Sequence, residues 1–254
     1  MKKTVLITGC NTKIGAAIVK KFLQNDWYVV GTDKENECLE KNENFEYVQG
    51  NLCKQEDRER ILGETVKDFK RIAALVNAVN VEPREKKDLL QTTEDDFDFA
   101  IENNLKGIFF ISQIVAKKMI SQRKNYEICG RIVNISSMYA YLSSVDRSEY
   151  CLSKASVSTM TKLFAHRFAP DGIIVNELRP GMIESIMTKE EDEVFLKDRE
   201  KYRTLKENGF IPLERWGMIS DISDAAYLLC NGNLPYIVGQ SIDIDGGIHL
   251  QRIY

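Results

Sequence analysis

The sequence predicts an α/β fold, a doubly wound parallel sheet with helices on both faces. Short apolar runs rich in β-branched residues alternate with stretches in which apolar residues recur every three or four positions. Parallel strands need helical crossovers of this kind. The 254 residues suit one large domain, and no linker or internal repeat divides them. We therefore expect a single domain over residues 1–254.

Each expected strand is a short run of apolar and β-branched residues that ends at a polar or turn residue. The first, TVLIT, ends at Gly9, and the sixth, IIVNEL, is followed by Pro180 and Gly181. The fifth, RIVNIS, alternates in a way that predicts a buried strand. The expected strands cover residues 4–8, 27–32, 45–49, 72–78, 131–136, 173–178 and 240–244.

Helices are expected between these strands, where apolar residues follow the helical period. The first begins near Ile14, a second lies around residues 61–69, and a long helical stretch runs from about residue 94 to 122. The last predicted helix follows Asp146, a candidate N-cap with Glu149 three positions later, as in a capping box.

The segment 182–210, between the last two expected strands, begins with apolar residues and continues with dense charge of both signs. Its start follows a strand end, which is where open α/β sheets hold ligands. We expect it to close over a bound ligand as a substrate lid, with its charged part exposed.

The composition excludes several functions. The net charge is −3 with acidic and basic residues nearly balanced, so no nucleic-acid partner is expected. The six cysteines and two histidines are scattered without metal-ligand spacing, which predicts no metal site and favours free thiols in a reducing compartment. No segment approaches the ~18 apolar residues of a membrane span. We expect a soluble cytoplasmic protein without a membrane partner.

The stretch SSMYAYLSSVDRSEYCLSK, residues 136–154, places a hydroxyl, a phenol and an ammonium where they could act on one carbonyl. Tyr150 and Lys154 are four residues apart on the predicted helix, so they share one face. The ammonium should favour the phenolate and lower the pKa of Tyr150 towards the working pH. Ser137 follows the fifth strand, at the carboxyl edge of the sheet. Tyrosine and lysine at this spacing also occur on solvated helix faces, so the context decides.

The turn between the first strand and the first helix, TGCNTKIG from Thr8 to Gly15, is a candidate phosphate site. Its backbone N–H groups and the helix dipole would attract a pyrophosphate. Asp33 ends the second strand 18 residues after Gly15, about the spacing at which a carboxylate binds the adenosine ribose and repels a 2′-phosphate. This favours NAD over NADP.

Together these motifs resemble the short-chain dehydrogenase/reductase family, and the similarity covers nearly the whole chain. The turn is similar to the family's T-G-x-x-x-G-x-G. RPGMIES (179–185) resembles its P-G-x-x-x-T stretch, while SEYCLSKA and LPYIVGQ resemble the branch named 3-oxoacyl-ACP reductase. The family's Asn-Ser-Tyr-Lys tetrad is matched by Asn104, Ser137, Tyr150 and Lys154.

The resemblance implies a Rossmann-type sheet of about seven strands in the order 3-2-1-4-5-6-7 and hydride transfer between a nicotinamide and a carbonyl or secondary alcohol. Tyr150 would exchange the proton, Ser137 would hydrogen-bond the oxygen, and Lys154 would hold the ribose. Asn104, at a position where the long helix is expected to be locally irregular, would hold a water. It also implies a homotetramer or dimer. The expected cofactor-binding residues are Gly9, Asn11, Thr12, Lys13, Ile14, Gly15, Asp33, Asn51, Leu52, Asn77, Ala78, Val79, Tyr150, Lys154, Pro180, Gly181, Ile183 and Ser185.

The sequence departs from the family pattern beside the expected cofactor. Asn77-Ala78-Val79-Asn80 replaces N-N-A-G, and Asn51 replaces an aspartate near the adenine. Lys13 replaces the middle glycine of the turn, where it would obstruct the pyrophosphate yet could pair with a phosphate, including that of NADP. We weigh Asp33 above Lys13 and predict NAD, with NADP as the alternative.

The substrate is less constrained than the reaction. The branch resemblance suggests a 3-oxoacyl thioester on acyl carrier protein, with Met138 and Met182 among residues that could line an apolar pocket. No dense basic cluster is present to attract an acidic carrier protein, so a small ketone, sugar or polyol is an alternative. A third interpretation is a catalytically silent dinucleotide-fold binding protein, motivated by Lys13, Val79 and Asn80 and opposed by the complete tetrad.

Overall fold

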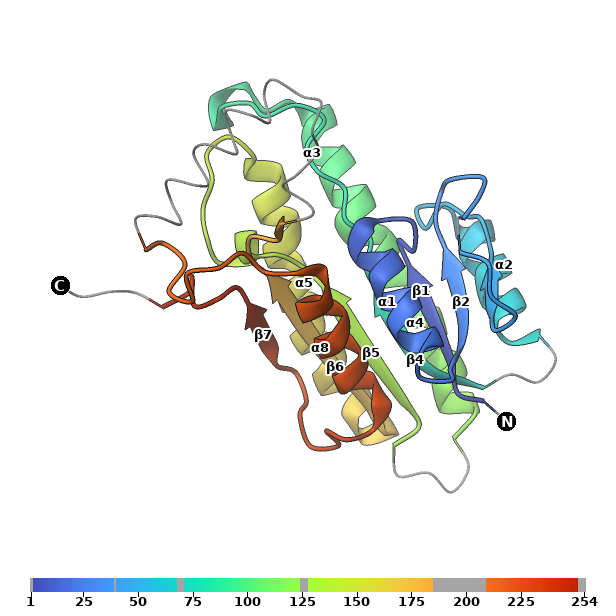
Figure 1. The fold of residues 1–254 in the computed structure, drawn as a ribbon. Coiled ribbons are helices and arrows are strands. Elements are labelled where there is room, and N and C mark those ends of the chain that lie inside the picture. Colours follow the sequence, from blue (N-terminus) through green and yellow to red (C-terminus); the bar gives the residue numbers. More distant parts are fainter. Residues whose placement is uncertain (1, 39, 68–70, 124–127, 185–208, 251–254) are drawn as a thin grey trace.

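The computed structural model describes residues 2–38, 40–67, 71–123, 128–184 and 209–250. Its centre is a seven-stranded sheet in the order β3-β2-β1-β4-β5-β6-β7 (Figure 1). Every neighbouring pair is parallel, which confirms the predicted sheet and strand order. The strands are β1 Thr4–Thr8, β2 Tyr28–Thr32, β3 Phe45–Tyr47, β4 Ile72–Asn77, β5 Gly130–Ile135, β6 Ile173–Pro180 and β7 Ser241–Ile244.

Helices cover both faces of the sheet. The long stretch predicted from residue 94 to 122 is divided by a π-helical turn, Glu102–Lys106. A helix after residue 218 was not predicted. α5 has Arg147 rather than Asp146 at its N-cap, and the Asp146 carboxylate accepts a hydrogen bond from Ser144. The helices are α1 Lys13–Leu23, α2 Gln55–Thr65, α3 Glu94–Ile101, α4 Gly107–Ser121, α5 Ser148–Phe168 and α8 Ile219–Asn231, with short 3₁₀ turns at Leu89–Gln91, Met138–Ala140 and Ala169–Asp171.

The core consists of two apolar layers, one on each face of the sheet. On one face, side chains such as Leu75 and Ile132 pack against α2, α4 and α5. On the other, residues such as Val76 and Val133 pack against α1 and α8 (Figure 1). Successive residues of one strand thus enter opposite layers, as the period of two in a strand requires. Both faces are covered, so the strands are apolar almost throughout.

The carboxyl ends of the central strands lie level with one another. Thr8 pairs with Asn77, and Asn77 pairs with Asn134, in the sheet register. The segments that follow β1, β4, β5 and β6 therefore begin at one edge, and this edge carries the residues that the sequence marked as functional.

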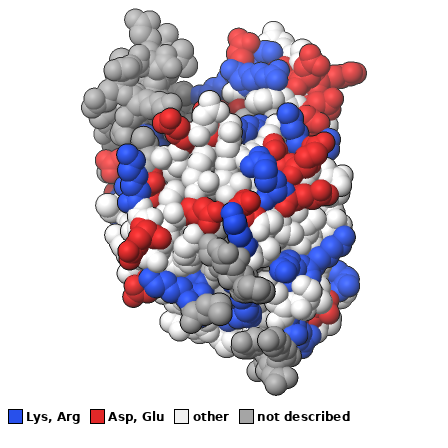
Figure 2. Space-filling view, turned by 90° about the vertical axis from the view of Figure 1, so that its right-hand side faces the viewer, with Lys and Arg blue, Asp and Glu red and all other residues white. Residues whose placement is uncertain are grey.

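The predicted lid, residues 182–210, falls mostly on residues 185–208, which lie outside the described part of the chain. Within that part, Met182 and Ile183 are buried. The lid and the single domain stay predictions. None of the helices among the described residues has the length and apolar character needed to cross a bilayer. Figure 2 shows one face of the molecule, on which acidic and basic side chains are interspersed.

Candidate active site

Ser137, Tyr150 and Lys154 come together at the carboxyl edge of the sheet. Ser137 lies just beyond β5, and α5 carries Tyr150 and Lys154 one turn apart, with both residues buried. Ser137 and Tyr150 line one cavity of about 100 Å³. The structure therefore places three of the four predicted tetrad residues around one small site.

Tyr150 is held by a residue that the family pattern does not supply. Its hydroxyl donates a hydrogen bond of 2.7 Å to Oδ1 of Asn80, and its ring lies edge-on to that of Tyr139 with centroids 5.9 Å apart. Burial, followed by the negative charge of Glu82, raises the pKa of Tyr150 well above its ordinary value. The prediction that Lys154 lowers the pKa of Tyr150 is therefore wrong, because desolvation of the phenolate outweighs the effect of the neighbouring charges.

Lys154 is fully buried, and its Nζ lies 5.4 Å from the centroid of the Tyr150 ring. Within the described part of the chain this ammonium has no hydrogen-bond partner. Burial lowers its pKa to about 8, and the carboxylates of Glu82 and Glu177 partly offset that effect. A buried ammonium without an acceptor is costly. Its surroundings therefore suit a ligand that brings oxygen acceptors, such as the hydroxyls of a ribose.

The Ser137 hydroxyl faces the Tyr150 phenol, and this contact partly offsets the rise in the pKa of Tyr150. Ser137 Oγ accepts a 3.2 Å hydrogen bond from the backbone N–H of Tyr139, at the start of a short 3₁₀ turn. A serine hydroxyl can accept and donate at once, so this bond fixes Oγ while its O–H can still donate towards the cavity.

Asn104 lies in the π-helical turn and is fully buried. Its side chain accepts from the N–H of Val81 and donates to the carbonyl of the same residue, both at 2.9 Å. The local irregularity expected at this position is present, and the side chain fastens the loop after β4. A water held by Asn104 stays a prediction.

Two charged residues of the site, Glu82 and Arg147, were missed by sequence reasoning. Both line the cavity of Ser137 and Tyr150, as does Asn80. Asn80 was noted only as a departure from the family pattern. Arg147 precedes Tyr150 by three residues, about one helical turn, and this spacing was the signal that could have found it.

The turn after β1 has the geometry expected of a phosphate site. Gly9 has a φ of +68°, and a Cβ there would lie 2.7 Å from the backbone of Ala78. Thr12 caps α1, because its Oγ1 accepts from the N–H of Gly15 at 2.9 Å. The helix thus begins at the turn with its positive end facing the sheet edge. Lys13, the first residue of α1, is exposed.

A second cavity follows the end of β2. Its lining includes Asp33, Asn51, Leu52 and Val79, four of the residues predicted to bind the cofactor. Asp33 Oδ2 accepts from the N–H of Asn11 at 3.1 Å, so this carboxylate also holds the phosphate turn. Asn51 Oδ1 accepts from the N–H of Cys53 at 3.0 Å, within its own loop.

The other residues predicted to bind the cofactor lie in several different places. Asn77 is buried in the sheet, where its amide donates to Ser112 and Asn134, so its side chain does not face a cavity. Ser185 lies outside the described residues. Ile14, Ala78, Pro180, Gly181 and Ile183 line the same cavity as Tyr150.

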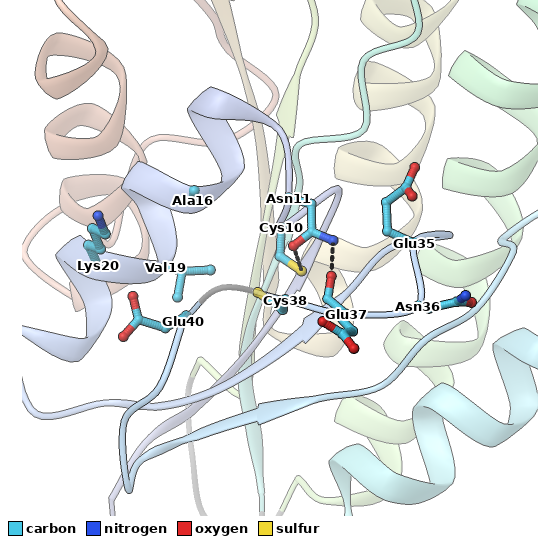
Figure 3. Close-up of a pocket in the computed structure, with 10 residues that line it drawn as sticks. All are labelled: Cys10, Asn11, Ala16, Val19, Lys20, Glu35, Asn36, Glu37, Cys38 and Glu40. Atoms are coloured by element: carbon cyan, nitrogen blue, oxygen red, sulfur yellow. Dashed lines mark hydrogen bonds between the residues drawn. The ribbon is translucent and has the colours of Figure 1, made fainter.

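A larger cavity, of about 730 Å³, lies elsewhere (Figure 3). It opens between α1 and the loop after β2, where Asn11 Nδ2 donates to the carbonyl of Glu37. Its lining includes Glu35, Glu37 and Glu40 together with Cys10 and Cys38. We place the chemistry in the smaller cavity, because Ser137 and Tyr150 line that one and Lys154 lies next to Tyr150.

Proteins of known function are similar to nearly the whole chain. Residues 9–249 match the family model described as enoyl-(acyl carrier protein) reductase. The 3-oxoacyl-[acyl-carrier-protein] reductase of Thermotoga maritima is 32% identical, with 97% of each chain covered. The 2-dehydro-3-deoxy-D-gluconate 5-dehydrogenase of Dickeya dadantii is 28% identical, covering 96% of this chain and 94% of the relative.

Solved structures resemble the whole chain as well. A 3-oxoacyl-[acyl-carrier protein] reductase from Brucella melitensis in complex with NAD has a TM-score of 0.89 at 27% identity, covering 100% of this chain and 99% of the other. The protein ElxO with NADP bound has a TM-score of 0.84 at 29% identity, covering 99% of this chain and all of the other.

Proposed function

We propose a function from the premise that this chain belongs to the short-chain dehydrogenase/reductase family. It is an NAD(P)-dependent oxidoreductase that acts on a carbonyl or a secondary alcohol. We assign the proton-transfer chemistry to Tyr150, with Ser137 and Lys154 beside it. The observation that supports this most is the meeting of these three residues at one buried site at the carboxyl edge of the sheet.

The residues present fit a dinucleotide. The buried Lys154 ammonium lacks an acceptor among the described residues, and ribose hydroxyls would provide one. The capped start of α1 suits a pyrophosphate, and Asp33 suits the hydroxyls of the adenosine ribose. When bound, the nicotinamide supplies or accepts the hydride.

In the reducing direction Tyr150 acts as a general acid. The raised pKa keeps the phenol protonated at neutral pH, which is the form that can donate. Ser137 donates a hydrogen bond to the same substrate oxygen and stabilises the charge that develops there. Before it can donate, the Tyr150 hydroxyl must give up its bond to Asn80, because a phenol has a single proton.

We propose NAD as the preferred cofactor. Asp33 would repel the 2′-phosphate of NADP, and three glutamates line the neighbouring cavity (Figure 3). The exposed Lys13 favours NADP instead, because its ammonium could pair with the additional phosphate. ElxO, crystallised with NADP, and the Brucella reductase, crystallised with NAD, show that proteins of this fold take either cofactor.

Two substrate classes have support from relatives. The Thermotoga relative is named for a 3-oxoacyl group on acyl carrier protein, and the Dickeya relative for a sugar acid. A catalytically silent binding protein is the third alternative, and the meeting of Ser137, Tyr150 and Lys154 speaks against it.

We also propose a homotetramer or dimer in the cytoplasm. Apolar side chains on α4 and α5, such as Phe110 and Leu163, are exposed. The six cysteines are free, as is usual in a reducing compartment.

The Tyr150→Phe variant tests the reaction. We expect turnover of acetoacetyl thioesters or sugar acids to fall by at least about 10²-fold, because the general acid is lost. Titration of protein fluorescence with NADH and NADPH should show unchanged binding, tighter for NADH. Undiminished turnover in the variant contradicts the assignment of Tyr150, and failure of the wild type to bind either cofactor supports the silent alternative.

A further inference from the structure

The catalytic cavity contains a guanidinium that the proton-transfer chemistry does not use. Arg147 is only 7% exposed and lines the same cavity as Ser137 and Tyr150. A substrate whose carbonyl oxygen lies between Ser137 and Tyr150 would therefore present its neighbouring atoms to Arg147.

The guanidinium is held in place before any ligand arrives. Its Cζ lies 4.8 Å from the centroid of the Tyr139 ring, and its Nε lies 3.4 Å from a carboxylate oxygen of Asp146. A planar guanidinium fixed in this way loses little freedom on binding, and its N–H groups match the two oxygens of a carboxylate.

A carboxylate already faces this guanidinium. Glu82 Oε2 lies 3.6 Å from Nη1 of Arg147, and Glu82 Oε1 accepts a 3.3 Å hydrogen bond from Asn80. The Glu82 side chain is 54% exposed, whereas that of Arg147 is 9% exposed. The acid is thus the loosely held member of the pair, and a ligand carboxylate can take its place.

We propose that Arg147 binds a carboxylate of the substrate and that the substrate is a small oxo acid or hydroxy acid. This deepens the proposed function and rests on it. The cavity of about 100 Å³ suits a group of a few heavy atoms. Glu82 competes with the substrate carboxylate for Arg147. Arg147 therefore increases the preference for acids over neutral substrates, and Glu82 decreases it.

The test compares acids with their neutral amides as substrates: acetoacetate with acetoacetamide, and pyruvate with pyruvamide. The proteins are the wild type, Arg147→Gln, Arg147→Lys, Glu82→Gln and the control Arg167→Gln, which changes an exposed arginine of α5 paired with Asp171. The measured quantity is the ratio of kcat/KM for the acid to kcat/KM for the amide, with NADH and with NADPH.

We expect a ratio of at least about tenfold in the wild type for one of the two pairs, because a carboxylate pairs strongly with a guanidinium in a desolvated site. The ratio should fall towards one in Arg147→Gln and lie between one and the wild-type value in Arg147→Lys. It should rise above the wild-type value in Glu82→Gln and stay at that value in the control Arg167→Gln. A wild-type ratio of one or less in both pairs, or a ratio that Arg147→Gln leaves unchanged, overturns the proposal.

A binding measurement separates this inference from the proposed reaction. Thermal melting with isobutyrate or isobutyramide at equal concentration should show stabilisation by the acid in the wild type and less in Arg147→Gln. If that holds while no carbonyl compound is reduced, the oxidoreductase proposal alone fails. Equal shifts for acid and amide in the wild type overturn the inference whatever the reaction.

Discussion

At the scale of single residues, the site gathers polar groups that are costly to bury. Lys154 is fully buried and lacks a hydrogen-bond partner within the described residues, and the Tyr150 phenol is bonded to Asn80. Burial raises the pKa of Tyr150 and lowers that of Lys154, so it favours the neutral form of each side chain. Such shifts are typical of functional sites, where stability is lost so that a group can react.

Replacing Lys154 by methionine should therefore stabilise the protein and abolish turnover. We expect the free energy of unfolding at pH 7 to rise by up to about 3 kcal/mol, because a buried ammonium is removed. The pKa of Lys154 is about 8 in the folded protein and 10.5 ordinarily, so the folded state releases this proton first as the pH rises. The stabilisation of Lys154→Met relative to the wild type is thus full below pH 8 and disappears by about pH 10.5.

Urea unfolding of the wild type and Lys154→Met at pH 7 and pH 10 measures this difference. Turnover provides the second readout, since a purely structural lysine would leave it intact. A methionine variant that is less stable than the wild type at pH 7 would show that Glu82 and Glu177 compensate the ammonium fully.

At the scale of elements, two irregular segments shape the site. The turn from Gly9 to Thr12 needs a left-handed glycine, and the π-helical turn Glu102–Lys106 buries Asn104 against the loop after β4. The first segment prepares the start of α1 for an anion. The second holds the loop whose Asn80 and Glu82 enter the cavity. The first segment joins β1 to α1, and the second lies between α3 and α4.

Gly9→Ala should weaken both folding and cofactor binding. The positive φ of +68° and a Cβ 2.7 Å from the Ala78 backbone make alanine strained, at a cost of at least about 1 kcal/mol. Thermal melting and NADH titration measure the two losses. Gly63→Ala is the matched control: Gly63 is exposed in α2 with nothing within 4 Å of an added Cβ, so alanine there should stabilise by roughly 0.5–1 kcal/mol. Equal effects at both positions would contradict the role of the turn.

At the scale of the whole molecule, the parallel sheet determines where function lies. All seven strands run in one direction, so the segments after β1, β4, β5 and β6 leave the same edge. Residues 9, 80, 137 and 180, which are far apart in sequence, therefore contribute to neighbouring cavities. The outer faces of α4 and α5 remain exposed, with Phe110 at 37% and Leu163 at 61%.

We expect α4 and α5 to form a contact between subunits, since exposed apolar side chains gather at such surfaces. Light scattering after gel filtration should give a dimer or tetramer for the wild type and a smaller species for Leu163→Glu. Lys20→Glu, on α1 across the sheet, is the control and should leave the mass unchanged. A wild-type monomer, or an unchanged mass in Leu163→Glu, would contradict the prediction.

The sequence by itself determined the strands, their parallel arrangement and the tetrad candidates, because periodicity and motif spacing are local properties of the chain. It also located Asn104 in an irregular stretch of the long helix. It missed α8, although the buried Ile222, Ala226 and Leu229 recur at helical spacing. It also placed the N-cap of α5 at Asp146, whose carboxylate instead accepts a hydrogen bond from Ser144.

Only the tertiary structure brought Asn80 to the Tyr150 hydroxyl and placed Glu82 and Arg147 in the same cavity. It also reversed the expected pKa shift of Tyr150, because burial depends on everything that packs around the ring and not on the lysine one turn away. Contacts between distant segments and the loss of solvent are decided by the fold as a whole, so spacing along the chain could not predict them.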